Sequence, residues 1–166
     1  NTGYQRSSTT TKGSRTSTTP IGSVINGKQQ QQKYLPLIMS MHNIEYCATA
    51  SPSHMSDLVA KVQKGLEASK KGFAYLHIFS PCPTGWAYPS NKGIEIARNA
   101  VKANVFPLWE MDQDGYKLNF KNKNPISVGE FVKGIGKFKN LTGEDIDSIQ
   151  KYTNKRYEIL RRLAIG

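Results

Sequence analysis

The stretch that decides the fold reads Ala74-Tyr75-Leu76-His77-Ile78-Phe79-Ser80-Pro81-Cys82-Pro83-Thr84-Gly85-Trp86. Its first six residues form an apolar run with the length and composition of a buried strand. The prolines fix φ on both sides of Cys82 and remove backbone donors, so we expect the thiol on a stiff, non-helical loop after that strand. Such a thiolate suits a metal or a partner at a set position, but a lone cysteine is more often a small buried apolar residue.

Strand-like and helix-like segments alternate around this stretch. Strands are expected at 45–50, 74–79 and 105–110, and helices at 34–41, 55–71 and 91–102. The helix that starts at Met55 is amphipathic, because apolar residues recur at helical spacing. These residues are Met55, Leu58, Val59, Val62 and Leu66. The alternation predicts right-handed crossovers and a parallel sheet, so the fold class is α/β. Ligands of such sheets lie beyond the carboxyl ends of the strands, where Cys82 is expected.

The two ends of the chain have a different character. Residues 1–33 are rich in Ser and Thr and poor in apolar side chains, which predicts a long loop or a segment wrapped on another surface. Asp114-Gly115 predicts a hairpin, and capping boxes at Ser127 and Thr142 predict two helices in the tail. We therefore expect an α/β unit over 1–110, and a hairpin and helical tail over 111–166. The tail is expected to pack on a partner subunit, and the alternative is packing on its own sheet.

The charge is strongly positive, with 23 Lys and Arg against 12 Asp and Glu and a formal net charge of +11. This balance favours an acidic partner, although a solvated surface is the plainer interpretation. The 2 cysteines are too few for a disulfide framework. The chain begins at Asn1, and no leader or long apolar span appears, so the sequence predicts a cytoplasmic protein without a membrane partner.

A second informative stretch is Asn1-Thr2-Gly3-Tyr4-Gln5-Arg6-Ser7-Ser8. It combines amide, hydroxyl and guanidinium groups with a glycine that permits close backbone approach. These groups suit an anionic ligand such as a diphosphate. A polar loop without a function would have a similar composition.

The two stretches, in this order and at this separation, resemble the β subunits of the pyruvate:ferredoxin oxidoreductases, within the thiamine-diphosphate-dependent 2-oxoacid:ferredoxin oxidoreductase family. Asn1-Thr2-Gly3 and Gln5-Arg6-Ser7 look like the active-site segment of the family, and 80–86 looks like its late cysteine loop. The likeness covers nearly the whole chain. It also includes Gly27-Lys28 and the segments 46–51, 106–110 and 138–142.

The resemblance implies the C-terminal part of that β subunit, with 1–110 belonging to a thiamine-diphosphate- and Mg2+-binding fold. The implied reaction is oxidative decarboxylation of a 2-oxoacid to acyl-CoA and CO2, with coenzyme A as co-substrate and electrons passed through 4Fe-4S clusters to ferredoxin. The family's Gly-Asp-Gly segment, its magnesium ligands and three earlier cysteines are not in these 166 residues. The fragment alone is therefore not expected to be active.

The resemblance also implies residue roles. Cys82 would be the fourth thiolate of the 4Fe-4S cluster nearest the thiamine diphosphate. Asn1 would be catalytic, beside the thiazolium ring and the carboxylate of the 2-oxoacid, and Asn1, Thr2, Gly3 and Gln5 would bind the cofactor. The implied partners are the remaining N-terminal part of the β subunit, its sister subunits and ferredoxin.

Two other functions fit parts of the pattern. A basic module that binds nucleic acid would use the positive charge, but the sequence has no nucleic-acid motif and its aromatic residues follow core spacing. A thiamine enzyme half without a cluster would leave Cys82 structural. Cys47 is expected to be buried inside a strand, and His42, His54 and His77 lack metal-site spacing.

Overall fold

The computed structural model describes residues 11–15 and 27–164. The α-helices in this part of the chain are α1 (Leu35–Ser40), α2 (Met55–Ser69), α3 (Pro83–Trp86), α4 (Gly93–Lys102), α5 (Val128–Val132) and α6 (Gly143–Leu163), and the 3-10 helices are η1 (Ser90–Lys92) and η2 (Gly136–Phe138). The strands are β1 (Tyr46–Ala50), β2 (Ala74–Ile78), β3 (Trp109–Asp112) and β4 (Gly115–Leu118).

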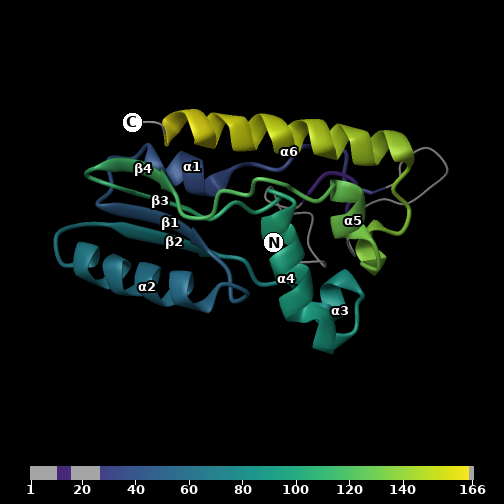
Figure 1. The fold of residues 1–166 in the computed structure, drawn as a ribbon, viewed down its shortest axis with the longest axis horizontal. Helices are drawn as coiled ribbons and strands as arrows, with labels where there is room; N and C mark the ends of the chain where they lie inside the picture. Colours follow the sequence, from purple (N-terminus) through teal and green to yellow (C-terminus); the bar gives the residue numbers. More distant parts are fainter. Residues whose placement is uncertain (1–10, 16–26, 165–166) are drawn as a thin grey trace.

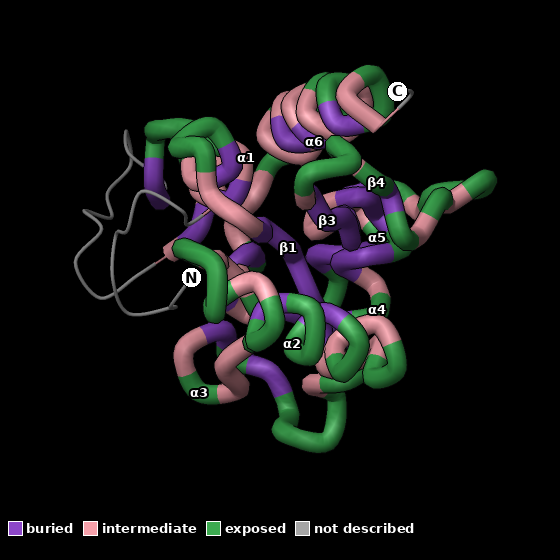
Figure 2. Tube along the Cα trace, turned by 90° about the vertical axis from the view of Figure 1, so that its left-hand side faces the viewer, coloured by how far each residue is buried: buried purple, intermediate pink, exposed green. Residues whose placement is uncertain are grey.

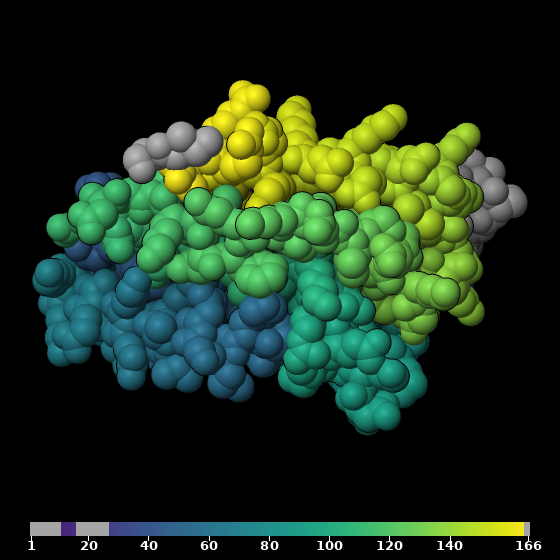
Figure 3. All heavy atoms as spheres, in the orientation of Figure 1, coloured from purple at the N-terminus to yellow at the C-terminus, as the bar shows by residue number. Residues whose placement is uncertain are grey.

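The strands form one sheet in the order β2-β1-β3-β4, with helices on both faces (Figure 1). Helix α2 covers β1 and β2 on one face, whereas α1 and the long α6 cover the other. In the space-filling view, α6 lies along one long side of the molecule and α2 along the opposite side (Figure 3). The expected α/β class is confirmed.

The direction of the third strand differs from the expected parallel sheet. Strands β1 and β2 pair in parallel, with Ala48 opposite Leu76, but β3 pairs antiparallel to β1 and begins only at Trp109. Helix α4 lies beyond the strand ends instead of crossing the sheet (Figure 1), so the chain enters β3 from the end at which it leaves β2. Thr49 fixes this entry, since its Oγ1 donates to Pro107 O at 2.7 Å and accepts from Trp109 N–H at 3.0 Å.

The hairpin and the tail follow the local sequence signals. Strands β3 and β4 are joined by a tight turn, with Asp112 opposite Gly115, and Gly115 has φ +102, which favours glycine. Both expected capping boxes are present, at Ser127 for α5 and at Thr142 for α6. None of the helices in the described part of the chain is long and apolar enough to cross a membrane.

Helix α2 has the expected bounds, but its apolar stripe faces away from the sheet. The stripe consists of Met55, Val59, Val62 and Leu66, all of which are exposed. Lys61 and Gly65 face inward instead, and a Cβ on Gly65 would come within 2.6 Å of Leu76 Cδ1. In the view turned by 90° from Figure 1, β1 is buried and lies behind α2, which is largely exposed (Figure 2). Helical periodicity therefore located the helix but not its buried face.

Candidate functional site

Cys82 begins a single helical turn after the carboxyl end of β2. Its Sγ accepts a hydrogen bond from Gly85 N–H at 3.3 Å, which makes Cys82 the N-cap of α3. Pro83 takes the first helical position, where the fixed φ of proline is favourable. Cys82 itself has extended backbone, as expected for a non-helical loop, but the loop ends there because Pro83 starts a short helix. The half-buried thiol is placed at a set position but is not sealed from a ligand.

Aromatic packing and a side-chain hydrogen bond hold this turn in place. Trp86 is 2% exposed, and its ring meets Phe79 and Phe138 edge-on, with centroid separations of 5.7 and 6.3 Å. Tyr88 Oη donates to Pro81 O at 2.9 Å. The backbone is therefore anchored both before and after Cys82.

Lys137 lies over the ring of Trp86, the last residue of α3. Its side chain is almost fully buried, and Nζ lies 3.3 Å from the centroid of the Trp86 ring. Burial lowers the pKa of Lys137 well below its ordinary value. Gly136 N–H donates to Ala87 O at 3.0 Å, which ties η2 to the end of α3. The cysteine turn and the buried lysine therefore belong to one packed unit.

A small cavity of about 110 Å³ opens beside this unit at the end of β2. Its walls include Trp86, His77, Phe106 and Arg156. The Arg156 guanidinium lies over the Tyr34 ring, with Cζ 4.0 Å from the ring centroid, and burial lowers the pKa of His77. The cavity thus combines aromatic walls with a cation at the end of the sheet where ligands of α/β folds bind.

Three buried nitrogen atoms near the cysteine turn and this cavity have no acceptor among the described residues. They are Trp86 Nε1, Lys137 Nζ and Arg156 Nε, and the buried Ser14 Oγ is also unpaired. An unsatisfied buried donor costs about 1–3 kcal/mol, so such groups call for a partner that the described residues do not supply. Unpaired donors beside a cysteine fit a group with negative charge, such as a thiolate-bound iron–sulfur cluster.

The segments on either side of residues 16–26 are clamped together next to η2. Gly13 N–H donates to Lys28 O at 2.7 Å, and Lys28 N–H donates to Ser14 O at 3.0 Å. Gly27 has φ +85, and a Cβ there would come within 2.6 Å of Gly13 O. Arg15 N–H donates to Lys137 O at 3.1 Å. The chain that follows the expected cofactor segment is therefore anchored beside Lys137.

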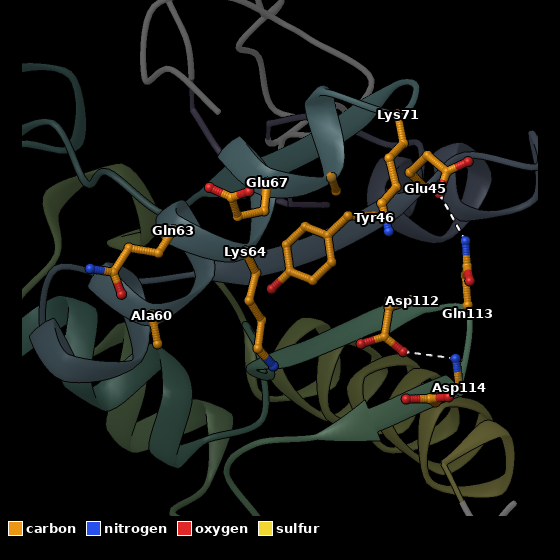
Figure 4. Close-up of a pocket in the computed structure, with 11 residues that line it drawn as sticks. Glu45, Tyr46, Ala60, Gln63, Lys64, Glu67, Lys71, Asp112, Gln113 and Asp114 are labelled. Carbon is orange, nitrogen blue, oxygen red and sulfur yellow. Dashed lines mark hydrogen bonds between the residues drawn. The ribbon is translucent and has the colours of Figure 1, made fainter.

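A larger cavity of about 670 Å³ lies at the opposite end of the sheet, between α2 and the β3–β4 turn (Figure 4). Charged side chains of both signs line it, including Glu45, Lys64 and Asp114. Hydrogen bonds within its wall, such as Gln113 Nε2 to Glu45 Oε2 at 3.1 Å, satisfy part of this lining. Since it is far from the carboxyl end of β2, we do not assign it to the site.

The structure describes only some of the expected site residues. Asn1, Thr2, Gly3 and Gln5 lie outside the described residues. Cys82 is described, and no cluster of three or more His, Cys, Asp or Glu that could hold a metal accompanies it within 11–15 and 27–164. Cys47 is fully buried as expected, and burial raises the pKa of its thiol to about 12.

Sequence reasoning missed Lys137 and Arg156. Lys137 carries one recognisable signal, a lone charge between the apolar residues Ile135 and Phe138 in a segment with core periodicity. Arg156 carries none, because a basic residue in the middle of a polar helix face is indistinguishable from its exposed neighbours.

Comparison with known proteins places this geometry in context. The chain is 46% identical over 165 residues to the β subunit of the NADH-dependent phenylglyoxylate dehydrogenase of Aromatoleum evansii. It is 42% identical over 166 residues to subunit VorB of the ketoisovalerate oxidoreductase of Pyrococcus furiosus, and 40% identical over 160 residues to subunit PorB of the pyruvate synthase of Methanocaldococcus jannaschii. The chain is a homologue of the β subunits of 2-oxoacid:ferredoxin oxidoreductases. The resemblance inferred from its motifs is therefore confirmed.

These alignments cover 96 to 99% of the chain. The chain in turn spans 53% of the pyruvate synthase and ketoisovalerate oxidoreductase subunits and 37% of the phenylglyoxylate dehydrogenase subunit. No protein-family model matches it. Because the relatives are subunits of oxidoreductases, the enzyme-subunit interpretation is favoured over a nucleic-acid-binding module.

Proposed function

We propose that this chain is the C-terminal part of a β subunit that, in the assembled enzyme, takes part in the oxidative decarboxylation of a 2-oxoacid to acyl-CoA and CO2. The observation that carries the proposal is Cys82, presented at the N-cap of α3 next to buried donors that lack acceptors. Homology to 2-oxoacid oxidoreductase subunits over nearly the whole chain supports the same assignment.

Cys82 is the proposed ligand of a 4Fe-4S cluster that accepts electrons one at a time. The chain's own contribution is to hold the thiolate in place. Gly85 N–H donates to Sγ at 3.3 Å and so fixes the position of the sulfur, and Trp86 covers the apolar side of the turn. Hydrogen bonding and burial of this kind set the potential of a bound cluster.

Asn1, Thr2, Gly3 and Gln5 are proposed to bind thiamine diphosphate and its Mg2+, with Asn1 beside the reacting carbon. Thiamine diphosphate would supply an electron sink for loss of CO2. Asn1 would orient the carboxylate of the 2-oxoacid through its amide, and Gly3 would allow the backbone to approach the diphosphate. The described residues that follow this segment are anchored beside η2 through 13–14 and 27–28.

The other proposed partners follow from the same assignment. The rest of the β subunit would supply the missing cluster cysteines and cover the apolar stripe of α2. Residues 111–166 would pack on a sister subunit, coenzyme A would accept the acyl group, and ferredoxin would take the electrons in the cytoplasm. The net charge of +11 suits an acidic electron carrier.

The test is Cys82→Ala in the assembled enzyme, with Cys47→Ala as the matched cysteine control. We expect Cys82→Ala to lose about four irons per β subunit and the electron paramagnetic resonance signal of one cluster, with loss of ferredoxin reduction. Cys47 donates to Pro36 O at 3.2 Å inside the core, so its replacement should lower stability and keep every cluster. Full iron content in Cys82→Ala would instead favour a thiamine enzyme half in which Cys82 is structural.

A further inference from the structure

We propose that Lys137 is a positioning residue that raises the reduction potential of the cluster held by Cys82. The inference rests on the proposed function, because it requires a cluster at Cys82. It concerns a residue of η2, a part of the chain to which the sequence motifs assign no role. Its basis is the placement of one buried lysine, whose Nζ has no acceptor among the described residues, behind the cysteine turn.

The first step is the connection between Lys137 and Cys82. Cys82 is the N-cap of the helical turn that ends at Trp86, and its side chain packs against the apolar cluster that contains Trp86. Lys137 Nζ lies 3.3 Å from the centroid of the Trp86 ring. Trp86 therefore contacts Lys137 Nζ and belongs to the apolar cluster on which Cys82 packs.

The second step is that this arrangement is rigid. Gly136 N–H donates to Ala87 O at 3.0 Å, directly after α3. A Cβ on Gly136 would come within 2.6 Å of Ala87 Cβ and 2.8 Å of Ala87 O, so the two backbones touch. Arg15 N–H holds Lys137 O from the other side at 3.1 Å. Lys137 thus has no freedom to move its backbone away from the cysteine turn.

The third step is that the charge of Lys137 is not neutralised locally. Lys28 and Lys61 are also buried, but Lys28 Nζ donates to Gln30 O at 2.6 Å, and Lys61 Nζ donates to Thr49 O and to the Asp57 carboxylate at 2.8 Å each. Lys137 Nζ has no acceptor among the described residues, and its contacts are with the Trp86 and Phe138 rings. A charge buried at this position is screened less than that of a surface lysine.

The consequence for a cluster follows from its charge. One-electron reduction adds a unit of negative charge to the cluster, and a nearby weakly screened cation stabilises the reduced form more than the oxidised form. The negative charge of the cluster in turn favours the ammonium form of Lys137 against the cost of burial. Removing this cation should therefore lower the midpoint potential.

The experiment is a redox titration of the assembled enzyme with dithionite, followed by electron paramagnetic resonance, for wild type, Lys137→Met, Lys137→Arg and the exposed control Lys139→Met. We expect reduction of this cluster in Lys137→Met to become about tenfold less favourable, a midpoint lowered by about 59 mV for a one-electron couple. Lys137→Arg and Lys139→Met should stay close to wild type, because the buried charge is kept in both. A purely structural role of Lys137 would leave the potential unchanged.

The outcomes separate this inference from the proposed function. Absence of the cluster from the wild-type enzyme would refute the proposed function, whereas a wild-type potential in a cluster-loaded Lys137→Met would refute only the role of Lys137. If the Lys137→Met enzyme assembles no cluster, the cluster content of Lys137→Arg decides whether the charge or the shape of the side chain is needed. Cluster retained in Lys137→Arg would show that the charge is needed, and cluster lost in both would show that shape alone matters, which overturns the proposal.

Discussion

At the scale of single residues, Glu110 links the layers of the fold on the side of the sheet that faces α2. It is 3% exposed, and its carboxylate accepts hydrogen bonds from three side chains. These come from Tyr46 Oη at 2.8 Å, Lys64 Nζ at 2.9 Å and Asn119 Nδ2 at 2.8 Å. Burial alone would raise the pKa of Glu110, but the hydrogen bonds from Lys64, Asn119 and Tyr46 outweigh it and lower the pKa.

Glu110→Gln should therefore lower the free energy of unfolding by about 3 kcal/mol at neutral pH, because three donors lose a buried charged acceptor. The folded-state pKa of Glu110 is below its ordinary value, so this stabilisation is present above the ordinary pKa and is lost as the pH falls through the folded-state pKa. Urea unfolding of wild type and variant, followed by fluorescence of the buried Trp86 and Trp109, tests both points.

The control for this prediction is Glu67→Gln, which removes an exposed ion pair with Lys70. It should change the free energy of unfolding by less than about 0.5 kcal/mol. A difference between Glu110→Gln and wild type that stays constant down to strongly acidic pH would contradict the argument.

Single residues also show how much of the candidate site could be predicted from the sequence. Cys82 was found from its flanking prolines and placed correctly after a strand, because both signals are local. Its N-cap geometry was missed, because Pro83 is compatible with a loop as well as with the first position of a helix. For Lys137 the sequence offered only a lone charge in an apolar segment, and its contact with Trp86, from a segment about 50 residues earlier, required the structure.

At the scale of elements, the joint between α3 and η2 is a close backbone contact of the candidate site. Gly136 permits this contact because it has no Cβ. A Cβ at this position would overlap Ala87 Cβ and Ala87 O. Gly134 follows α5 and has φ +78, and the chain turns there toward η2. The helical tail is therefore connected to the cysteine turn through one short 3-10 helix.

Gly136→Ala should lower the free energy of unfolding by about 2 kcal/mol, because the new methyl group overlaps the Ala87 backbone and displaces η2 from α3. The matched control is Gly143→Ala in the first turn of α6, where a Cβ would meet nothing within 4 Å. That change should raise stability by about 0.5 kcal/mol, since alanine restricts the unfolded chain. Urea unfolding of both variants checks the difference, and equal effects at the two glycines would contradict the close contact.

Elements specified by local chemistry were predicted well, and those specified by packing were not. The capping boxes at Ser127 and Thr142 and the turn at Asp114-Gly115 gave the tail and the hairpin, because each depends on a few neighbouring residues. The direction of β3 depends on where α4 packs, which its own residues do not specify. The same holds for α2, where helical spacing alone could not show which face meets the sheet.

At the scale of the whole molecule, Met55, Val59, Val62 and Leu66 form an apolar stripe on the side of α2 that faces away from the sheet. All four residues are 38 to 61% exposed, and Phe73 and Ile78, beside the edge of β2 with which no described strand pairs, are exposed as well. An apolar helix stripe beside a free strand edge is typical of a surface that another segment covers. Since the chain spans only part of its relatives, we expect the rest of the β subunit to cover it.

Replacing Val59 and Leu66 together with Gln in the full-length β subunit should lower its free energy of unfolding by about 3 kcal/mol, with subunit composition unchanged. The expected loss corresponds to about 1.5 kcal/mol for each apolar side chain that the rest of the subunit buries. Ser56→Gln, an exposed polar position on α2 outside the stripe, is the control and should have little effect. Unfolding in urea and sedimentation of the assembled enzyme are measured together. Loss of a sister subunit at unchanged β-subunit stability would assign the stripe to that subunit instead, and no change in either measurement would show that the stripe is a solvent-exposed face.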